Sequence, residues 1–330
     1  MPDAHVKQEP LGELFMSPDV DAARAFFRQK SRAMTDKRMS VREAVAEYIH
    51  DGDYLASGGF GSVRLSTAVL HEIVRRGRRN LGFSGHSTTH DFQILAAGRV
   101  IDRCDISYVV GLELRGLSPN GRRLMESGAV RTTEWSNAGL GWRYKAAAMG
   151  MPFLPVRTML GSDTGRYSAA QEITCPYTGG TYLAVPALFP DVAVIHVHQA
   201  DIYGNAEIQG VSIVDLDLAQ AARRLILTTE RIVSTDTFRS DPRRTSIPYW
   251  LVDAVCLVPF GSYPGEMPYE YGADDTHFTE WLEAERDPEI FETFLEKHIY
   301  GTQDFEEYLA LACPPERLAQ LRELDPLRSR

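Results

Sequence analysis

The sequence has no excess of basic residues. Lysine and arginine number 35 against 45 aspartates and glutamates, so the formal charge is −10 and the isoelectric point lies near 5.4. Nucleic-acid binding normally needs clustered lysine and arginine, and we therefore expect no nucleic-acid partner. An anionic ligand stays possible, because backbone N–H groups in a glycine loop can bind an anion locally.

Cysteine is scarce, and long apolar runs are missing. The four cysteines lie far apart without a C-x-x-C pair, at Cys104, Cys175, Cys256 and Cys313. Neither a zinc ribbon nor a disulfide scaffold is indicated, and a reducing cytoplasm fits best. No apolar run approaches the roughly 20 residues of a membrane span, and residues 1–5 do not begin a secretory signal. We expect a cytoplasmic protein that does not contact a membrane.

The sequence does contain a regular alternation of helix and strand patterns. Residues 1–38 form a polar extension with one predicted helix, from about Asp19 to Met34. The main domain follows over residues 39–330. Its core covers about 40–275 and opens with a helix that Ser40 caps, and its C-terminal segment, about 276–330, is predicted to be helical. With 44% hydrophobic residues, the composition is that of an ordinary globular protein.

Apolar runs of strand length recur between the predicted helices. The predicted strands cover residues 54–57, 81–84, 106–110, 153–156, 192–198, 225–228 and 254–258, and the predicted helices include 41–50, 68–74, one near Arg122, and 216–224. Such runs between helices are typical of buried strands in a parallel sheet. We predict an α/β fold with an open, mostly parallel sheet flanked by helices and wrapped by the C-terminal segment.

Glycines and an arginine follow the first predicted strand. Gly58, Gly59 and Phe60 stand at the start of a helix, with Arg64 four residues further on. Glycine lets the backbone turn its N–H groups toward a pyrophosphate or a developing oxyanion. As a dinucleotide fingerprint the stretch lacks the third glycine, and a tight turn without a ligand is the alternative. Arg64 is a candidate to pair with a carboxylate or phosphate of the ligand, or with an acid of the chain such as Asp91.

Polar loops after later strands supply the other candidates. Open α/β sheets bind ligands beyond the carboxyl ends of their strands, so the loop after the second strand is predicted to contact the substrate, with a polar surface loop as the alternative. A glycine and a serine after the 153–156 strand would add hydrogen-bond donors, and a polar turn after the 192–198 strand is predicted to be structural. These residues are Ser84, Gly85, His86 and Ser87; Gly161 and Ser162; and Gln199, Asp201, Gly204 and Asn205.

Histidines occur in two pairs. His196 and His198 would point to one face of a strand, and His86 and His90 would share a face if their segment were helical. Imidazoles can hold zinc, but no H-E-x-x-H arrangement accompanies these four. We therefore predict no metal site.

The glycine stretch is similar to the first signature of family I CoA-transferases, an Asp-Gly pair, a short strand and then Gly-Gly-Phe. Later segments resemble the glutaconate branch of that family: 146–156 leading to Gly161 and Ser162, 185–186 with 191–193, 195–205, and 252–255 before Pro259. Together they cover about residues 40–275 in the expected order. The chain resembles the α-type subunit of the glutaconate CoA-transferase branch.

The resemblance implies a fold, a reaction and a partner. The fold would be the CoA-transferase (NagB/RpiA-like) fold, and an α-type and a β-type chain would assemble as α2β2 or larger, with the active site at their junction. Acyl-CoA and a carboxylate would be the substrates, with coenzyme A as part of the substrate and no permanently bound cofactor. A glutamate of the β-type chain would attack the thioester. Its Ser-Glu-Asn-Gly motif is absent here, and the nearest text is Ser118-Pro119-Asn120-Gly121.

We therefore expect a dependent subunit with no certain catalytic residue of its own. The resemblance implies a dicarboxylic or related acyl-CoA as substrate, although Ser87, Thr88 and two histidines stand where the glutaconate branch has small residues, which argues against glutaconate itself. Other acids, Glu113, Glu134, Glu172 and Glu207, are predicted to be structural or solvated. The alternatives are an acyl-CoA hydrolase or decarboxylase on the same scaffold, and a non-catalytic metabolite-binding module or an isomerase related to it.

Overall fold

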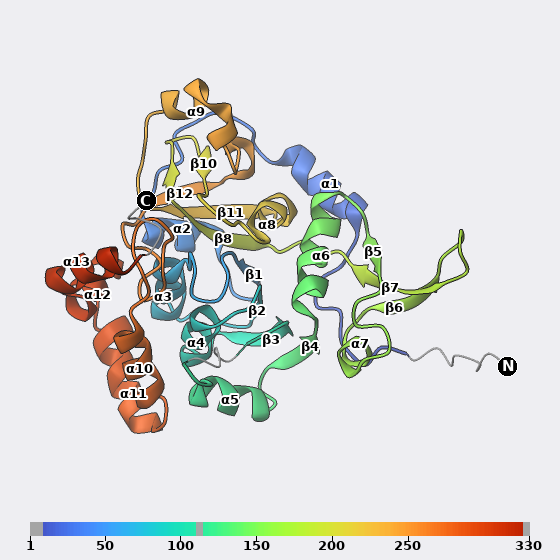
Figure 1. The fold of residues 1–330 in the computed structure, drawn as a ribbon, viewed down its shortest axis with the longest axis horizontal. Coiled ribbons are helices and arrows are strands. Elements are labelled where there is room, and N and C mark those ends of the chain that lie inside the picture. The colour runs from blue at the N-terminus through green and yellow to red at the C-terminus, as the bar shows by residue number, and fades with distance from the viewer. Residues whose placement is uncertain (1–8, 110–114, 326–330) are drawn as a thin grey trace.

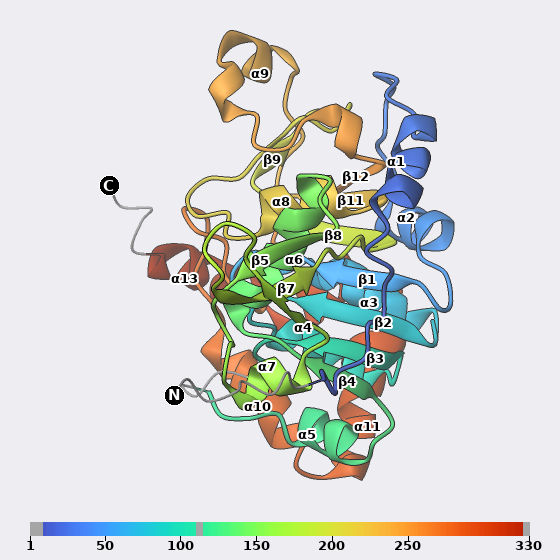
Figure 2. The same cartoon turned by 90° about the vertical axis from the view of Figure 1, so that its right-hand side faces the viewer.

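The computed structural model describes residues 9–109 and 115–325 and has a seven-stranded sheet at its centre. The strand order is β12-β11-β8-β1-β2-β3-β4, and every neighbouring pair is parallel (Figures 1 and 2). The strands are β1 (Tyr54–Ser57), β2 (Leu81–Gly85), β3 (Ile101–Ile106), β4 (Arg131–Glu134), β8 (Val192–Val197), β11 (Arg224–Thr229) and β12 (Ala254–Leu257). The predicted open parallel sheet is confirmed.

Alternating side chains give the sheet two apolar faces. In β1, Leu55 packs with one core while Tyr54 and Ala56 pack with the other. The first core contains α2 (Val41–Tyr48), α3 (Thr67–Arg75) and α4 (His90–Ala97), and the second contains α6 (Asn137–Ala148) and α8 (Asp215–Ala221). The helices that follow β1 and β2 thus cover one face, and those that follow β4 and β8 cover the other. The chain direction reverses between β1 and β8, which opens a crevice beyond the carboxyl ends of these strands.

A smaller antiparallel sheet lies beyond α6 (Figure 1). Its strands are β5 (Phe153–Val156), β7 (Thr181–Pro186) and β6 (Gln171–Thr174), accompanied by α7 (Asp163–Tyr167). The 153–156 segment is a strand as predicted, but it belongs to this second sheet and not to the parallel one. Strands β6 and β7 were not predicted, because their residues are only partly buried and show no apolar run.

The predicted strand over 106–110 is wrong. The strand is β3, over Ile101–Ile106, and Val110 lies outside the described residues. Its polar residues disguise it. Arg103 donates to Gly52 O at 2.6 Å and pairs with Asp102 at 2.7 Å, whereas Asp105 is buried in a network with aromatic residues and Arg143.

The N-terminal extension packs on its own chain as a strap, which we define as residues 9–39. Its helix, α1 (Val20–Gln29), is shorter than predicted. Near one end, Leu11 and Gly12 donate backbone hydrogen bonds to the α7 segment, and at the other Met39 donates to Val255 O at 3.1 Å on the edge strand β12. Lys30 Nζ lies 2.7 Å from Asp253 Oδ2. The strap therefore connects the small sheet with the far edge of the large one.

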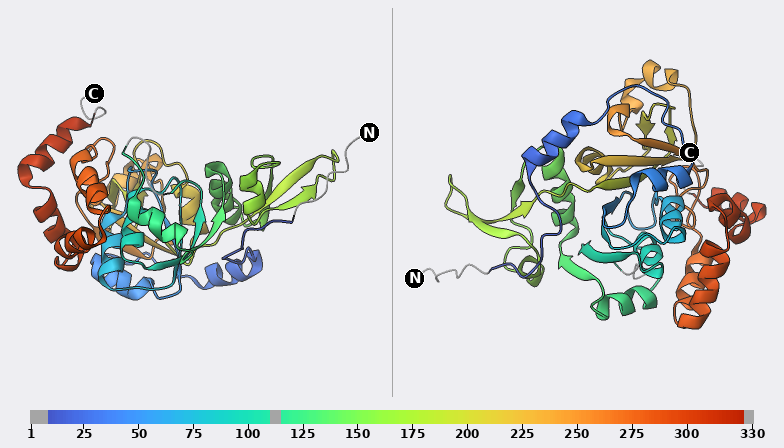
Figure 3. Two further views of the ribbon diagram at one scale, coloured as in Figure 1. Left: turned by 90° about the horizontal axis from the view of Figure 1, so that it is seen from below. Right: turned by 180° about the vertical axis from the view of Figure 1, so that it is seen from behind.

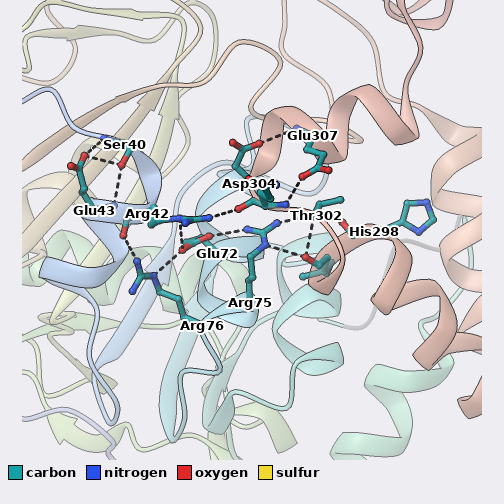
Figure 4. Close-up of polar contacts among 12 residues, drawn as sticks. Ser40, Arg42, Glu43, Glu72, Arg75, Arg76, His298, Thr302, Asp304 and Glu307 are labelled. Atoms are coloured by element: carbon teal, nitrogen blue, oxygen red, sulfur yellow. Dashed lines mark hydrogen bonds and ion pairs between the residues drawn. The ribbon is translucent and has the colours of Figure 1, made fainter.

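The C-terminal segment forms helices that cover α3 and α4, as predicted. They lie at the end of the molecule opposite the small sheet (Figure 3). Their bounds are α10 (Asp275–Ala284), α11 (Pro288–Leu295), α12 (Phe305–Ala312) and α13 (Pro315–Leu324), and the remaining helices are α5 (Pro119–Glu126) and α9 (Asp236–Ser240). Arginines of α2 and α3 bind this segment (Figure 4): Arg75 Nη2 donates to Thr302 Oγ1 at 3.0 Å and Arg42 Nη2 to Gln303 O at 2.6 Å. Within the described ranges, no helix has the length and apolar character to cross a membrane.

Candidate functional site

The loops after β1 and β2 meet at the carboxyl edge of the sheet. We call residues 58–64 the glycine loop. Gly61 N–H donates to Ser87 O at 3.0 Å, and the rings of Phe60 and His86 lie 5.5 Å apart between centroids. The structure therefore brings together the two segments that the sequence analysis assigned to one site, Gly58 to Arg64 and Ser84 to Ser87.

Every backbone N–H from Gly58 to Gly61 has an acceptor within the chain. Gly58 donates to Val194 O at 2.9 Å, Gly59 to Asp215 Oδ1 at 2.7 Å, and Phe60 to Val63 O at 3.0 Å, while Gly61 donates to Ser87 O. A Cβ at Gly59 would lie 2.4 Å from Val63 O, and its φ of +85° favours glycine. In this conformation the glycines serve to fold the loop tightly, and their N–H groups do not point to a ligand.

Arg64 is buried and pairs with an acid that the sequence analysis missed. Its side chain is 1% exposed, and Nη1 lies 2.6 Å from Asp215 Oδ2, whose side chain is 0% exposed. Nη2 donates to Val211 O at 2.9 Å. The structural alternative for Arg64 is therefore what the structure has, with Asp215 in place of Asp91 as partner. Asp215 begins α8 within the apolar text Val-Asp-Leu-Asp-Leu, and that isolated acid is the one signal available in the sequence.

Two polar groups of the second loop point inward. Ser84 Oγ lies 2.7 Å from Tyr144 OH, and both side chains are buried, so Ser84 holds α6 to the sheet. The Asp91 carboxylate accepts hydrogen bonds from Thr89 N–H and Phe92 N–H at 2.8 and 2.9 Å. Burial nevertheless raises the pKa of Asp91 to about 6. A carboxyl group that can hold a proton near neutral pH thus lies at the end of β2.

The histidines around the crevice are neutral near pH 7. Burial lowers the pKa of His86, whose Nδ1 is buried without a hydrogen-bond partner among the described residues. Burial also lowers the pKa of His198 to about 4; its Nε2 donates to Pro268 O at 2.8 Å and its Nδ1 accepts from Gln209 N–H at 3.0 Å. His196 lies 2.8 Å from Glu230. In the part of the chain that the structure describes, no group of three or more His, Cys, Asp or Glu is arranged to hold a metal.

Gly161 and Ser162 lie in the smaller lobe and not beside the glycine loop. Ser162 caps α7, where its Oγ accepts from Gly165 N–H at 3.2 Å. Together with Pro10 of the strap, Gly161 and Ser162 line a hollow of about 250 Å³. The sequence analysis expected them near the ligand because it placed the preceding strand in the parallel sheet.

The polar turn after β8 is closed on itself. Asp201 Oδ1 accepts from the N–H groups of Tyr203, Gly204 and Asn205 at 2.9 to 3.0 Å. Gln199 donates to Glu207, which Arg244 also binds. These contacts agree with the structural role that we predicted for the turn. Among the other acids considered above, Glu172 lines the hollow beside α7, and Glu113 lies outside the described residues.

Backbone strain gathers at the same edge of the sheet. Five residues other than glycine have positive φ values in the loops there: Arg64 (+58°), Ser87 (+53°), Ile213 (+48°), Phe260 (+57°) and Tyr269 (+69°). Such conformations persist only where the surroundings fix them, and they cluster at functional sites. The strained positions therefore mark the same crevice as the strand topology does.

A crevice at the reversal point of a parallel sheet, bordered by a glycine loop, defines a ligand-binding α/β protein, and comparison with known proteins specifies which. The coenzyme A transferase family model matches residues 38–257, and the chain belongs to that family.

Curated relatives agree in length and in subunit type. The chain is 34% identical to the α-type subunit of 3-oxoadipate CoA-transferase from Pseudomonas knackmussii (82% of this chain, 96% of the relative) and 31% identical to the α-type subunit of glutaconate CoA-transferase from Acidaminococcus fermentans (83% and 91%). An uncharacterized protein of Archaeoglobus fulgidus is 48% identical over all of this chain and 74% of its own length. The chain is thus an α-type CoA-transferase subunit by sequence.

Solved structures support the same assignment. The crystal structure of the Acidaminococcus fermentans glutaconate coenzyme A-transferase superposes with a TM-score of 0.84 at 30% identity, covering 88% of this chain and 97% of that one. A variant of the decarboxylase AibA/AibB superposes with a TM-score of 0.71 at 33% identity, covering 80% and 99%. The predicted CoA-transferase fold and family are confirmed.

Proposed function

We propose that this chain is the α-type half of a heteromeric acyl-CoA:carboxylate CoA-transferase whose nucleophilic glutamate comes from a β-type partner. The observation that carries the proposal is the match to glutaconate CoA-transferase over 97% of the superposed chain, with the glycine loop in place. Ser118 caps α5 and Pro119 is its first residue, so this segment forms a helix start and offers no nucleophile.

The proposed enzyme is cytoplasmic and acts without a resident cofactor, because coenzyme A enters with the substrate. It takes a dicarboxylic or related acyl-CoA and assembles as α2β2 or larger. The chemistry splits one exchange into two steps. The partner's glutamate displaces CoA from the acyl group, and the acceptor carboxylate then takes over the CoA. The role of this chain is to form one wall of the pocket with Phe60, His86 and Ser87.

The test is co-purification with the β-type chain, followed by assays with a panel of acyl-CoA donors and carboxylate acceptors. We expect transfer by the complex, none by this chain alone, and a glutamyl-CoA thioester that hydroxylamine or borohydride traps. Transfer activity in the isolated chain, or a complex that neither transfers CoA nor yields the trapped thioester, would contradict the proposal.

A second candidate function is decarboxylation or hydrolysis of an acyl-CoA by the same scaffold. The similarity to AibA/AibB and the protonatable Asp91 at the end of β2 favour it. The residue at the partner's nucleophile position separates the two, since glutamate supports transfer and any other residue supports the second function. Release of carbon dioxide or free CoA without an acceptor acid would establish it.

A further inference from the structure

Three chain segments that border the crevice are joined by Arg64 and Asp215, which we call the latch. Asp215 binds both the Arg64 guanidinium, at 2.6 Å, and Gly59 N–H, at 2.7 Å. Arg64 in turn donates from Nη2 to Val211 O and from its backbone N–H to Glu266 O, both at 2.9 Å. The latch therefore holds the glycine loop, the segment before α8 and the segment after β12 in one arrangement.

Each charge of the latch depends on the other. With side-chain exposures of 1% and 0%, neither group has water to replace a lost partner. A buried charge left alone is strongly unfavourable, whereas a buried pair replaced by two neutral groups is often tolerated. The 2.6 Å contact also lacks hydrogen-bond alignment, and Arg64 Nε has no hydrogen-bond partner among the described residues. The pair is thus not arranged for the best possible hydrogen bonding, and the segments that it fixes give a reason for its presence.

Space around the latch is fully used. A Cβ at Gly58 would lie 2.5 Å from Asp215 Oδ1, and Arg64 has a φ of +58° that a side chain rarely adopts. A substrate carboxylate could reach the Arg64 guanidinium only if Asp215 moved away. The positive charge of Arg64 is therefore balanced inside the chain and is not presented to the crevice.

We propose that Arg64 and Asp215 are positioning residues of the acyl-transfer site. They hold the glycine loop and Phe60 against the crevice, and they do not bind a charge of the substrate. This inference rests on the proposed CoA-transferase function. It implies that a distal carboxylate of the acyl group, if the substrate has one, is recognised by another cation, for example one from the β-type chain.

The experiment compares the complexes of wild type, Arg64→Gln, Asp215→Asn and the double variant Arg64→Gln/Asp215→Asn. Each single variant leaves one buried charge unpaired, and displacement of the loop is expected to lower kcat about tenfold or more with little change in KM. The double variant has no unpaired charge and is expected to regain most of the lost kcat, a coupling that the cycle measures. Asp253→Asn is the matched control. It breaks a largely buried pair at the amino edge of the sheet and should leave kcat per assembled complex unchanged.

The outcomes separate the alternatives. A double variant as inactive as Arg64→Gln, with a raised KM for the substrate carboxylate, would show that Arg64 binds substrate and would overturn the proposal, as would single variants of wild-type kcat. Inactivity of the wild-type complex would instead refute the proposed function. If a single variant does not fold, the double variant and Arg64→Lys carry the test. Arg64→Lys keeps the charge and is expected to retain more kcat than Arg64→Gln.

Discussion

Gly58 shows how little room single residues have at this site. A methyl group there would lie 2.5 Å from Asp215 Oδ1 and 2.9 Å from Ile195 Cγ1. We expect Gly58→Ala to lower the free energy of unfolding by about 2 to 3 kcal/mol, the range for overpacking a filled site. It should also lower the activity of the complex, because Asp215 must shift. Urea denaturation and steady-state kinetics measure the two effects.

Gly52→Ala is the control for this prediction. Gly52 has a φ of +86° but nothing within 4 Å of an added Cβ, so only the backbone conformation is strained. We expect a loss of about 1 kcal/mol and no change in activity. Equal effects at both glycines would mean that the contact with Asp215 is unimportant.

At this scale the sequence predicted neighbours but not partners. It placed Gly58 to Phe60 beside Ser84 to Ser87 because the carboxyl ends of adjacent parallel strands share one edge of the sheet. It could not show that Gly59 binds Asp215, since 156 residues separate the two and only the packing of α8 brings them together. Helix starts rich in acids are common, and the sequence offered no reason to single out Asp215.

At the scale of elements, buried histidines distinguish the C-terminal helices. His71 of α3 and His90 of α4 face His277 of α10, next to Tyr308 and His298. His277 Nε2 lies 3.0 Å from Tyr308 OH, and both ring nitrogens of His71 lack a hydrogen-bond partner in the described part of the chain. Burial lowers the pKa of His90 to about 4 and of His277 to about 3, and it lowers that of His71 well below its usual value.

These shifts predict that the C-terminal helices loosen in acid. The unfolded chain binds protons at these histidines below about pH 6.5, while the folded chain does not, so stability falls with pH from about 6.5 toward 4. Each such histidine should cost about 2 kcal/mol of stability between pH 7 and pH 5. The charged groups nearby, Arg75, Arg115 and Lys297 together with Asp274 and Glu280, do not reverse the direction.

The variant His71→Phe tests this directly, because it removes a titrating group whose ring nitrogens make no hydrogen bond within the described residues. We expect the variant to lose about 2 kcal/mol less than wild type between pH 7 and pH 5 in urea denaturation. The exposed His50→Gln serves as control and should keep the wild-type dependence. A parallel pH dependence of His71→Phe and wild type would contradict the prediction.

Element types were more predictable than element neighbours. The long apolar strands β8, β11 and β12 and the capped helix α2 follow from their patterns, and Ser40 forms the expected capping box with Glu43. Strand β3 was misplaced because its buried acid, Asp105, is neutralised by Arg143 from α6. The second sheet was missed because its strands are half exposed and pair antiparallel across sequence that reads as loops.

At the scale of the whole molecule, the strap is the connection between the two sheets. Lys30 Nζ lies 2.7 Å from Asp253 Oδ2 and from Leu251 O, and 2.9 Å from Arg223 O, with its side chain only 8% exposed. Three acceptors therefore converge on one buried ammonium group. Burial lowers the pKa of Lys30, and the nearby Asp253 opposes this shift. The convergence predicts that this anchor, more than the exposed contacts of the strap, holds residues 9–39 in place.

Lys30→Met keeps the length of the side chain and removes its charge. Because it leaves Asp253 and two carbonyl groups without their partner, we expect the free energy of unfolding to fall by about 3 kcal/mol. Amide hydrogen exchange should rise throughout the strap, while β1 and β2 stay protected. Arg131→Gln removes an ion pair with Glu13 whose side chains are 54% and 53% exposed, and it should cost less than about 1 kcal/mol. If Lys30→Met cost no more than Arg131→Gln, the strap would be held by its backbone contacts and apolar packing instead, and the buried ammonium group would not be its anchor.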